Sequence, residues 1–292
     1  MPIDPSVAIG AALPDRTFSW SSSDVLLYHL AIGAGTRPGD HLDATALRYT
    51  YDGDLQVLPS FGVVAPSLHE TEPPAVSFPG CEIDLAAVVH GSQEIRVHAP
   101  IPTAGTATLQ TRITDIWDKG KAAVIWQEGT AVDQDGAALW TVRSSIFARG
   151  EGGFGGARGE STAITVPDQA PDLTATYAVT PQQALLYRLC GDRNPLHADP
   201  AFARSAGFPA PILHGLCTWG ITLREVTDRL LGADAGRVSG WRARFAGVVF
   251  PSDALQIRGW RTEAGVAVDV AIADGPRAGS PVLADGLVRV AP

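Results

Sequence analysis

The stretch that decides the fold is residues 187–232, YRLCGDRNPLHADPAFARSAGFPAPILHGLCTWGITLREVTDRLLG. Its last part, from residue 211 on, is apolar at first and amphipathic later, which predicts one long helix. Segments that alternate apolar and polar residues follow, and they predict strands in VSGWRARFAGVVF, ALQIRGWRTE, VAVDVAIA and PVLADGLVRV. A helix followed by neighbouring strands predicts a unit in which an antiparallel sheet packs on the helix.

The first half of the chain has the same order of elements. A short apolar helix is predicted in DVLLYHLAIGAG (24–35), capped by Ser23 or Asp24, and a second, buried helix near residues 58–64. Strands are predicted in EIRVHAPI, ATLQTRITDIW, AAVIWQEGTAV and ALWTVRSSIFAR. DVLLYHLAIGAG aligns with QALLYRLCGDRN (183–194), so that Tyr28 matches Tyr187. The two halves are therefore predicted to be copies of one unit.

The division between the copies falls in a stretch that is dense in Gly, Pro and small polar residues. We predict an N-terminal unit over residues 1–150, a linker over 151–172 and a C-terminal unit over 173–292. We expect the chemistry in the second copy, because the alignment pairs its reactive residues with inert ones: Asp192 with Gly33, Asn194 with Gly35, and His197 with Pro38.

Composition limits the class of protein. The 292 residues are 45% hydrophobic and 18% charged, which excludes a disordered chain. The net charge of −9 argues against nucleic-acid binding as the main activity. Three cysteines without metal-ligand spacing indicate a reducing compartment. No signal peptide or membrane-spanning segment is visible, so we expect a soluble, cytoplasmic protein without a membrane partner.

The densest group of reactive side chains lies in residues 190–215. Asp192 and His197 are five residues apart and cannot share a helix face, but a turn through Asn194 and Pro195 can bring them together. Such a pair can hold a water molecule, take its proton and give one up. The alternative is an ordinary Asx-Pro turn with a surface histidine, and the residues alone leave both interpretations open.

Other chemistries fit this segment less well. A calcium loop would need a Gly at its sixth position and a terminal Glu, and both are missing. The spacing is too wide for a metal site, so no metal is expected. A Ser–His–Asp hydrolase would need a Gly-x-Ser-x-Gly turn, which the sequence lacks. Cys190 and Cys217 lie in apolar contexts that favour core positions over nucleophilic ones.

Gly215 falls at the start of the predicted long helix. Free backbone N–H groups and the positive end of the helix dipole favour negative charge there, and glycine lets an oxygen approach closely. This arrangement suits the oxygen of a thioester carbonyl that becomes negative as an enolate forms. The alternative is a glycine that serves packing, with His214 as a polar core residue.

The run from Tyr187 to Gly220 resembles the signature of type 2, (R)-specific, enoyl-CoA hydratases of the MaoC-like dehydratase family. The similarity extends in family order to LLYHLAIGAG, LPSFGVV, VVHGSQEIRVHAPIPTAG, DKG (118–120), GGFGGAR (152–158) and RARFAGVVFP (242–251). It implies an α+β double hot-dog fold, in which each of two repeats has a long helix wrapped by an antiparallel sheet. It also implies a homodimer.

The resemblance implies the roles of individual residues as well. Asp192 and His197 correspond to the catalytic pair, Asn194 shapes their loop, and Gly215 supplies the N–H of the oxyanion hole. Contacts with the acyl-CoA are implied for a further set: His90, Gly91, Lys119 and Phe245. Lys119 and Lys121 are the chain's two lysines beside 20 arginines, which makes Lys119 a candidate for the CoA phosphates. Without the family, an ordinary turn lysine would be the better interpretation.

The expected reaction is the reversible hydration of a trans-2-enoyl-CoA to a (3R)-hydroxyacyl-CoA. Coenzyme A is part of the substrate, so no separate cofactor is expected. Within enzymes, the alternatives are a dehydratase of acyl-carrier-protein or polyketide thioesters and a hot-dog thioesterase. From another class, the alternative is an acyl-CoA-binding protein without catalysis, which would be expected to lack Asp192 or His197.

Overall fold

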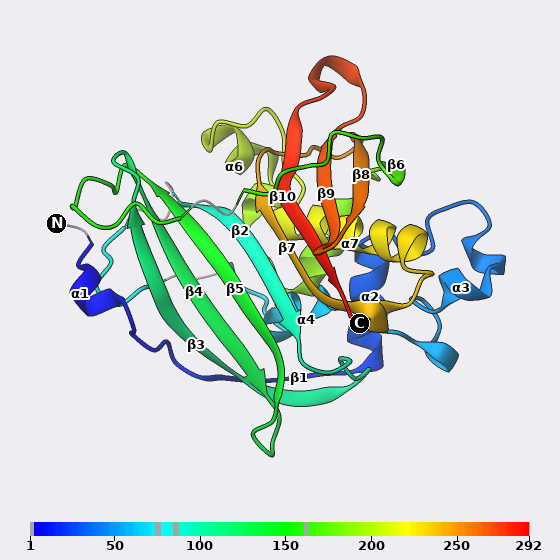
Figure 1. Cartoon of the computed structure of the whole chain (residues 1–292), viewed down its shortest axis with the longest axis horizontal. Coiled ribbons are helices and arrows are strands. Elements are labelled where there is room, and N and C mark those ends of the chain that lie inside the picture. The colour runs from blue at the N-terminus through cyan, green and yellow to red at the C-terminus, as the bar shows by residue number, and fades with distance from the viewer. Residues whose placement is uncertain (1–2, 74–76, 84–87, 161–162, 292) are drawn as a thin grey trace.

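Ten strands pair into one antiparallel sheet in the computed structural model, which describes residues 3–73, 77–83, 88–160 and 163–291 (Figure 1). Their order across the sheet is β1-β3-β4-β5-β2-β7-β10-β9-β8-β6. The strands are β1 (Arg16–Trp20), β2 (Val88–Val97), β3 (Gly105–Asp118), β4 (Ala122–Val132), β5 (Ala138–Arg149), β6 (Leu173–Ala178), β7 (Val238–Phe245), β8 (Ala254–Thr262), β9 (Gly265–Ile272) and β10 (Pro281–Val290).

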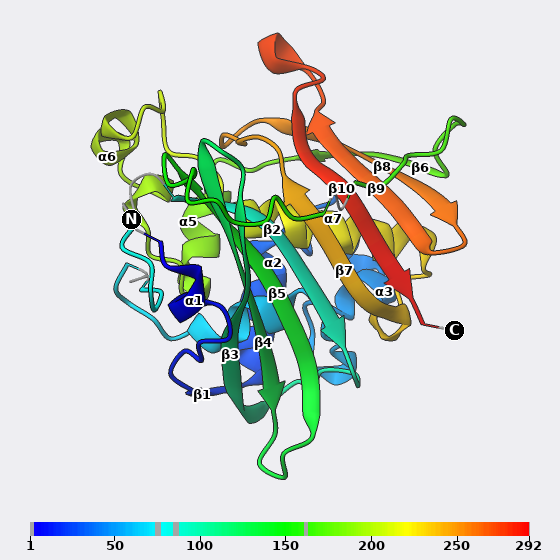
Figure 2. The ribbon, with the colours of Figure 1, turned by 60° about the vertical axis from the view of Figure 1, so that its left-hand side comes forward.

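The two halves of the chain meet in the middle of the sheet. Strands β1 to β5 lie on one side and β6 to β10 on the other, and β2 pairs with β7 from Ser92↔Arg244 to Arg96↔Gly240. Figures 1 and 2 show this junction, where the cyan and orange strands run side by side. Backbone hydrogen bonds therefore continue across the halves, so neither half has an exposed edge at the junction.

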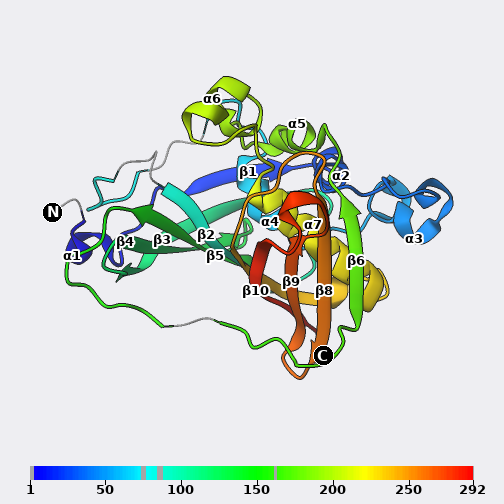
Figure 3. The ribbon, with the colours of Figure 1, turned by 90° about the horizontal axis from the view of Figure 1, so that it is seen from above.

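Helices cover one face of the sheet, as the view from above shows (Figure 3). The α-helices are α1 (Pro5–Ala8), α2 (Ser22–Ala31), α3 (Ala44–Leu47), α4 (Phe61–Val64), α5 (Gln183–Tyr187), α6 (Pro200–Ser205) and α7 (Gly215–Leu230). Short 3-10 turns join them at Asp40–Leu42, Asp52–Asp54, Ala65–Ser67, Arg188–Cys190, Pro195–His197, Ala235–Arg237 and Gly275–Arg277. None of the helices in the described ranges is long and apolar enough to cross a membrane.

Helix α7 is the centre of the larger core. Twelve of its sixteen residues are buried, and the helix contacts β6, β7 and β8. Trp219 of α7 stacks on Trp241 of β7 with ring centroids 5.6 Å apart, and its backbone carbonyl accepts a hydrogen bond from the indole N–H of Trp241. A buried strand face packed on a buried helix is what the alternating sequence of β7 requires.

Helices α2 and α5 are the aligned segments of the two halves, and they lie side by side. Their matched tyrosines, Tyr28 and Tyr187, are both buried, with ring centroids 6.3 Å apart. Helix α2 begins earlier than predicted, because Ser21 caps it and forms a capping box with Asp24. The cap at Ser23 or Asp24 was therefore a wrong prediction, although Asp24 does take part in the box.

A buried ion cluster also joins the halves. Arg37 from the first half contacts Glu225 and Asp228 of α7, and Glu225 also accepts from its neighbour Arg224. Arg224 donates to the carbonyl oxygen of Gly33. The side chains of Arg224 and Glu225 are almost completely buried, so their charges depend on each other and on Arg37 for compensation.

The predicted linker, residues 151–172, has neither helix nor strand among its described residues. It crosses the sheet on the face away from the helices (Figure 3). Gly159 lies against the ring of Trp117 in β3, the backbone N–H of Ile164 donates to Asp285 in β10, and Trp260 in β8 donates to the carbonyl of Gln169. The chain thereby passes from β5 in the first half of the sheet to the far edge of the second half, where β6 begins.

Candidate active site

The loop after α5 carries Asp192 into the interior. The 3-10 turn Arg188–Cys190 ends at Gly191, whose φ of 105° is unfavourable for residues with a side chain. A Cβ atom at Gly191 would lie 1.7 Å from the carbonyl oxygen of Ser67. Only glycine fits this close approach, and the turn it permits directs the chain from the helix into the Asp192 loop.

Asn194 holds the loop in a tight turn, as its sequence predicts. Its backbone N–H donates to Oδ1 of Asp192 at 3.1 Å, and its side-chain oxygen accepts from the N–H of Leu196 at 3.0 Å. The second bond caps the 3-10 turn Pro195–His197, which ends on His197. The Asx-Pro turn is present, but His197 is 9% exposed, so the turn delivers a buried histidine and not a surface one.

The backbone fixes the tautomer of His197. Its Nδ1 lies 2.8 Å from the carbonyl oxygen of Ile212. Because a carbonyl only accepts, Nδ1 carries the proton, and Nε2 is left with a lone pair. Burial lowers the pKa of His197 below its ordinary value, which favours this neutral form. The ring is thus prepared to accept a proton at Nε2.

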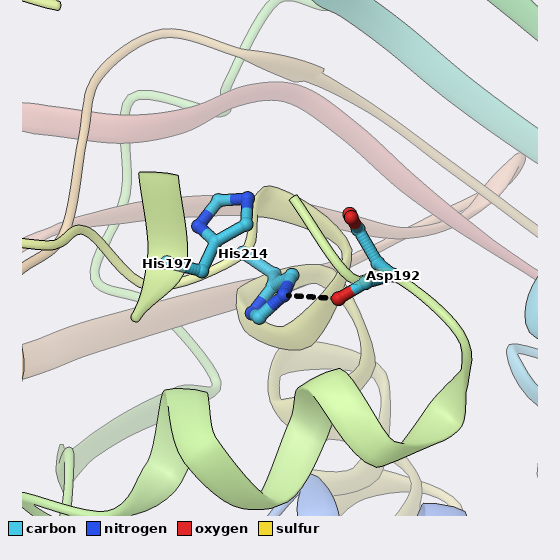
Figure 4. Close-up of side chains that lie close together, drawn as sticks. All are labelled: Asp192, His197 and His214. Atoms are coloured by element: carbon cyan, nitrogen blue, oxygen red, sulfur yellow. Dashed lines mark hydrogen bonds between the residues drawn. The ribbon is translucent and has the colours of Figure 1, made fainter. Parts of the chain in front are cut away.

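His214 lies directly against this pair (Figure 4). Its imidazole stacks on that of His197 with ring centroids 3.7 Å apart and an interplanar angle of 28°. Its Nε2 lies 3.3 Å from the backbone carbonyl oxygen of Asp192. Burial, together with His197, lowers the pKa of His214 well below its ordinary value. The sequence places His214 in the reactive stretch 190–215 without a role of its own, with a polar core residue as the alternative. In the structure its contacts link both members of the predicted pair.

The group of Asp192, His197 and His214 also raises the question of a metal ion, since their ligand atoms lie within 4.8 Å of one another. Metal ions bind the in-plane lone pairs of imidazole rings. Nδ1 of His197 and Nε2 of His214 already face the carbonyl oxygens of Ile212 and Asp192, so each ring has one nitrogen left for a ligand. That the site works without a metal ion stays a prediction.

Gly215 begins helix α7, as predicted, beside the same group. His214 is the residue before the helix and makes no side-chain cap, so the first backbone N–H groups have no capping partner from it. A Cβ atom at Gly215 would lie 3.0 Å from ring atoms of Phe245. The missing side chain thus leaves room at the helix start, bordered by Phe245.

A bulge in β2 lies next to His90, which reaches the start of helix α7. The pairing of β2 with β5 shifts between His90 and Ser92, so Gly91 is the extra residue. The imidazole of His90 packs on Phe245 with centroids 4.6 Å apart, and burial lowers the pKa of His90 to about 4. The negative charge of Asp192 offsets part of this lowering of the His90 pKa. His90 and Phe245 therefore lie beside Asp192 and Gly215 at the candidate site. Gly91, in contrast, packs toward Ser145.

Lys119 lies apart from this group, in the turn between β3 and β4. Its ammonium donates to the carbonyl oxygen of Arg158 and lies 5.0 Å from the ring centroid of Trp117. The register places this turn at the same end of the sheet as His90, three strands away, or roughly 14 Å at usual strand spacing. Any ligand that contacts both regions is therefore elongated.

A separate hollow of about 520 Å³ lies at the opposite end of β2 and β7, lined by Val97, His98, Ile101, Asp234 and Ser239 among others. None of the predicted site residues lines it. Buried residues between it and His90 along β2, such as Ile95, belong to the packed core. We therefore place the candidate site at the helix start of α7 and not in this hollow.

Comparison with known proteins gives two family matches. Residues 18–150 match the MFE-2 hydratase 2 N-terminal domain, and residues 162–272 match the MaoC-like domain. Over 89% of its length the chain is 56% identical to an enoyl-CoA hydratase, ChsH3, of Mycobacterium tuberculosis, covering 90% of that protein. It is 43% identical to 3-hydroxyacyl-thioester dehydratase Y of the same organism, with 99% of both chains covered.

Solved structures agree with the architecture. A MaoC-like dehydratase from Phytophthora capsici superimposes with a TM-score of 0.88 at 27% identity, covering 99% of this chain and 98% of that one. A Mycobacterium tuberculosis protein described as a double hotdog fold superimposes with a TM-score of 0.57 at 14% identity, covering 99% and 98%. The predicted double hot-dog fold is confirmed.

Proposed function

Since the chain belongs to the MaoC-like hydratases and dehydratases with an MFE-2 hydratase 2 N-terminal domain, which are hydro-lyases, we propose that it adds water to a trans-2-enoyl-CoA to give a (3R)-hydroxyacyl-CoA. The relative most similar in sequence among those compared above is an enoyl-CoA hydratase. The proposal includes the reverse dehydration, because an enzyme accelerates both directions of one reaction.

The observation that carries the proposal is the unprotonated Nε2 of His197 beside Asp192. Nδ1 is occupied by the Ile212 carbonyl, and Oδ1 of Asp192 by the N–H of Asn194. The second carboxylate oxygen and Nε2 are then the acceptors available to one water molecule. Water gives its oxygen to C3 and a proton to this pair, and the pair returns a proton to C2 on the same face. Atoms and charge balance without a further reactant.

Gly215 has the complementary role. As the proton acceptor acts on water, negative charge moves to the thioester oxygen, and the free N–H groups at the start of α7 stabilise it. His90 and Phe245 border this oxygen and place the thioester. Lys119, farther along the same end of the sheet, is proposed to contact the CoA phosphates. The absence of a separate cofactor, a cytoplasmic location and a homodimer stay predictions.

The test is hydration of crotonyl-CoA and of longer and branched trans-2-enoyl-CoAs by the purified chain, with chiral analysis of the 3-hydroxy product. We expect the 3R product and no release of free CoA thiol. A 3S product contradicts the proposed face of addition, and thiol release from a saturated acyl-CoA indicates a thioesterase instead.

One alternative substrate has a specific observation in its favour, because the relative matched over 99% of both chains is named a 3-hydroxyacyl-thioester dehydratase. The same Asp–His chemistry acts on a thioester of an acyl-carrier protein. Rates measured on CoA and carrier-protein thioesters with the same acyl group distinguish the two. A higher kcat/KM on the carrier-protein thioester overturns the CoA assignment and leaves the reaction type intact.

A further inference from the structure

His214 contacts three parts of the site at once. Its Nε2 lies 3.3 Å from the backbone carbonyl of Asp192, its ring stacks on His197 at 3.7 Å, and it directly precedes Gly215, the first residue of α7. No other described residue is placed by these contacts on both members of the pair and beside the helix start. It is 1% exposed, so water does not substitute for it.

The partner of Nε2 determines the proton position on this ring. The Asp192 carbonyl only accepts, so the Nε2 of His214 carries the proton and donates it. The other ring nitrogen, Nδ1, is buried and has no hydrogen-bond partner among the described residues. Burial lowers the pKa of His214, so the ring stays neutral with its single proton on Nε2. The ring therefore donates one hydrogen bond, and that bond goes to Asp192.

This bond fixes the peptide between Asp192 and Arg193, whose carbonyl oxygen is the acceptor. Gly191 lets the chain pass close to Ser67, but it has no side chain that could hold Asp192 in place. The carboxylate of Asp192 is held on its other side by the N–H of Asn194. With both bonds made, the backbone carbonyl and the carboxylate of Asp192 are each restrained by a hydrogen bond.

The stack restrains His197 in the same way. His197 is held at Nδ1 by Ile212, and its ring face is held by His214. Tyr187 packs against His214 with ring centroids 4.9 Å apart, which supports the stack. One imidazole thereby sets the distance between the Asp192 carboxylate and Nε2 of His197.

We propose that His214 is a positioning residue for the hydration reaction, and that it acts chiefly through the hydrogen bond from its Nε2 to the Asp192 carbonyl. This inference rests on the proposed function, since it assigns His214 a part in orienting the Asp192–His197 pair. His214 touches neither the water nor the thioester and supplies no proton to them.

Two substitutions separate the hydrogen bond from the ring. His214→Gln keeps an N–H donor of similar reach and loses the stack, whereas His214→Phe keeps a stacking ring and loses the donor. We expect kcat of His214→Phe to fall on the order of 10²-fold, the cost of a small misplacement of reacting groups. KM should change little, because binding groups such as His90 and Phe245 are untouched. His214→Gln should recover most of the lost kcat.

The measurements are kcat, KM and thermal unfolding of both variants on a thioester that the wild-type enzyme hydrates. Wild-type kcat in His214→Phe overturns the proposal. Equal loss of kcat in both variants, accompanied by equal loss of thermal stability, also overturns it, because a purely structural role predicts that result. Failure of the proposed function is seen separately, as absence of hydration by the wild-type enzyme.

Discussion

The two halves of the sheet place their helices differently over strands that pair in the same antiparallel manner. In the second half, sixteen-residue α7 packs under β7 and β8, and its first residue lies at the site. In the first half, only short helices pack on the sheet: four-residue α4, followed by a 3-10 turn, contacts β5, and four-residue α1 contacts β3. Pro38 is exposed where the second half has the buried His197. The second repeat thus has the reactive loop and a long helix, whereas the first has short helices and contributes His90 on strand β2.

The largest effect is expected from the proposed catalytic pair. Asp192→Asn or His197→Gln should lower kcat by about 10²–10⁴-fold, the range for loss of a general acid–base group. The matched control in the first repeat is Pro38→Ala, an exposed position that should leave kcat unchanged. Steady-state hydration rates and circular dichroism of each variant check both statements. Near-normal rates in either pair variant would remove that residue from the mechanism.

A second comparison concerns the glycines at the two helices. Gly215→Ala puts a methyl group 3.0 Å from Phe245 and crowds the proposed oxyanion position, so kcat should fall by up to about 10²–10³-fold. Gly62→Ala, in α4, puts a methyl group 2.9 Å from the Ile95 side chain. This variant should lower the free energy of unfolding by about 1–3 kcal/mol and keep the wild-type kcat. Rates and thermal unfolding of both variants should show opposite patterns. Equal losses of kcat would mean that α4 also borders the substrate.

The ion cluster between the halves should dominate stability at low pH. Burial raises the pKa of Glu225, but Arg224 and Arg37 lower it more, and the net shift is below its usual value of 4.5. Its stabilising effect is then fully present above about pH 4.5 and is lost as pH falls through the lowered pKa. Burial raises the pKa of Asp228, so the contribution of this carboxyl group to stability falls as pH rises, opposite to that of Glu225.

Glu225→Gln removes that dependence. It leaves Arg224 buried with less compensation, so the free energy of unfolding at pH 7 should fall by about 3–5 kcal/mol. Urea unfolding at pH 7 and at several values below 4.5 measures this. The variant should lose less stability on acidification than the wild type, and parallel curves for the two proteins would assign the acid sensitivity to other carboxylates.

The smallest effect is expected at Lys119. Lys119→Ala should raise KM for a CoA thioester several-fold with kcat unchanged, because binding that is equal in ground and transition states affects KM alone. Lys121→Ala is the control from the same turn, and its KM should stay close to that of the wild type. An unchanged KM for Lys119→Ala would separate this turn from the CoA site.

Much of this arrangement is readable from the sequence, for reasons that differ by element. Among the inner strands, the patterns of β3, β4, β5 and β7 to β10 predict the strands where they lie, but β2 runs over Val88–Val97 and not over the predicted residues 94–101. The sequence does not predict the two edge strands, β1 and β6. β6 is Leu-Thr-Ala-Thr-Tyr-Ala, in which small residues give little contrast between its two faces. Edge strands pair on one side only, so weaker patterns suffice there.

The candidate site divides in the same way. Asp192, Asn194 and His197 share one short loop, so their chemistry is visible as a motif. The stack of His214 on His197 joins residues 17 positions apart through the fold, and no local pattern encodes it. The contact that fixes the His197 tautomer comes from the backbone of Ile212, where the side chain is irrelevant. The role of Lys119 follows from the family resemblance of the DKG turn, and the scarcity of lysine only agrees with it.

The linker across the outside of the sheet has a consequence for assembly. The halves are already held by the β2–β7 pairing and by the ion cluster, so the linker acts mainly as a tether that raises the effective concentration of one half near the other. A single cut within residues 151–172 should leave an active, non-covalent pair of fragments. Dilution, which does not affect the intact chain, should then separate them and abolish the activity.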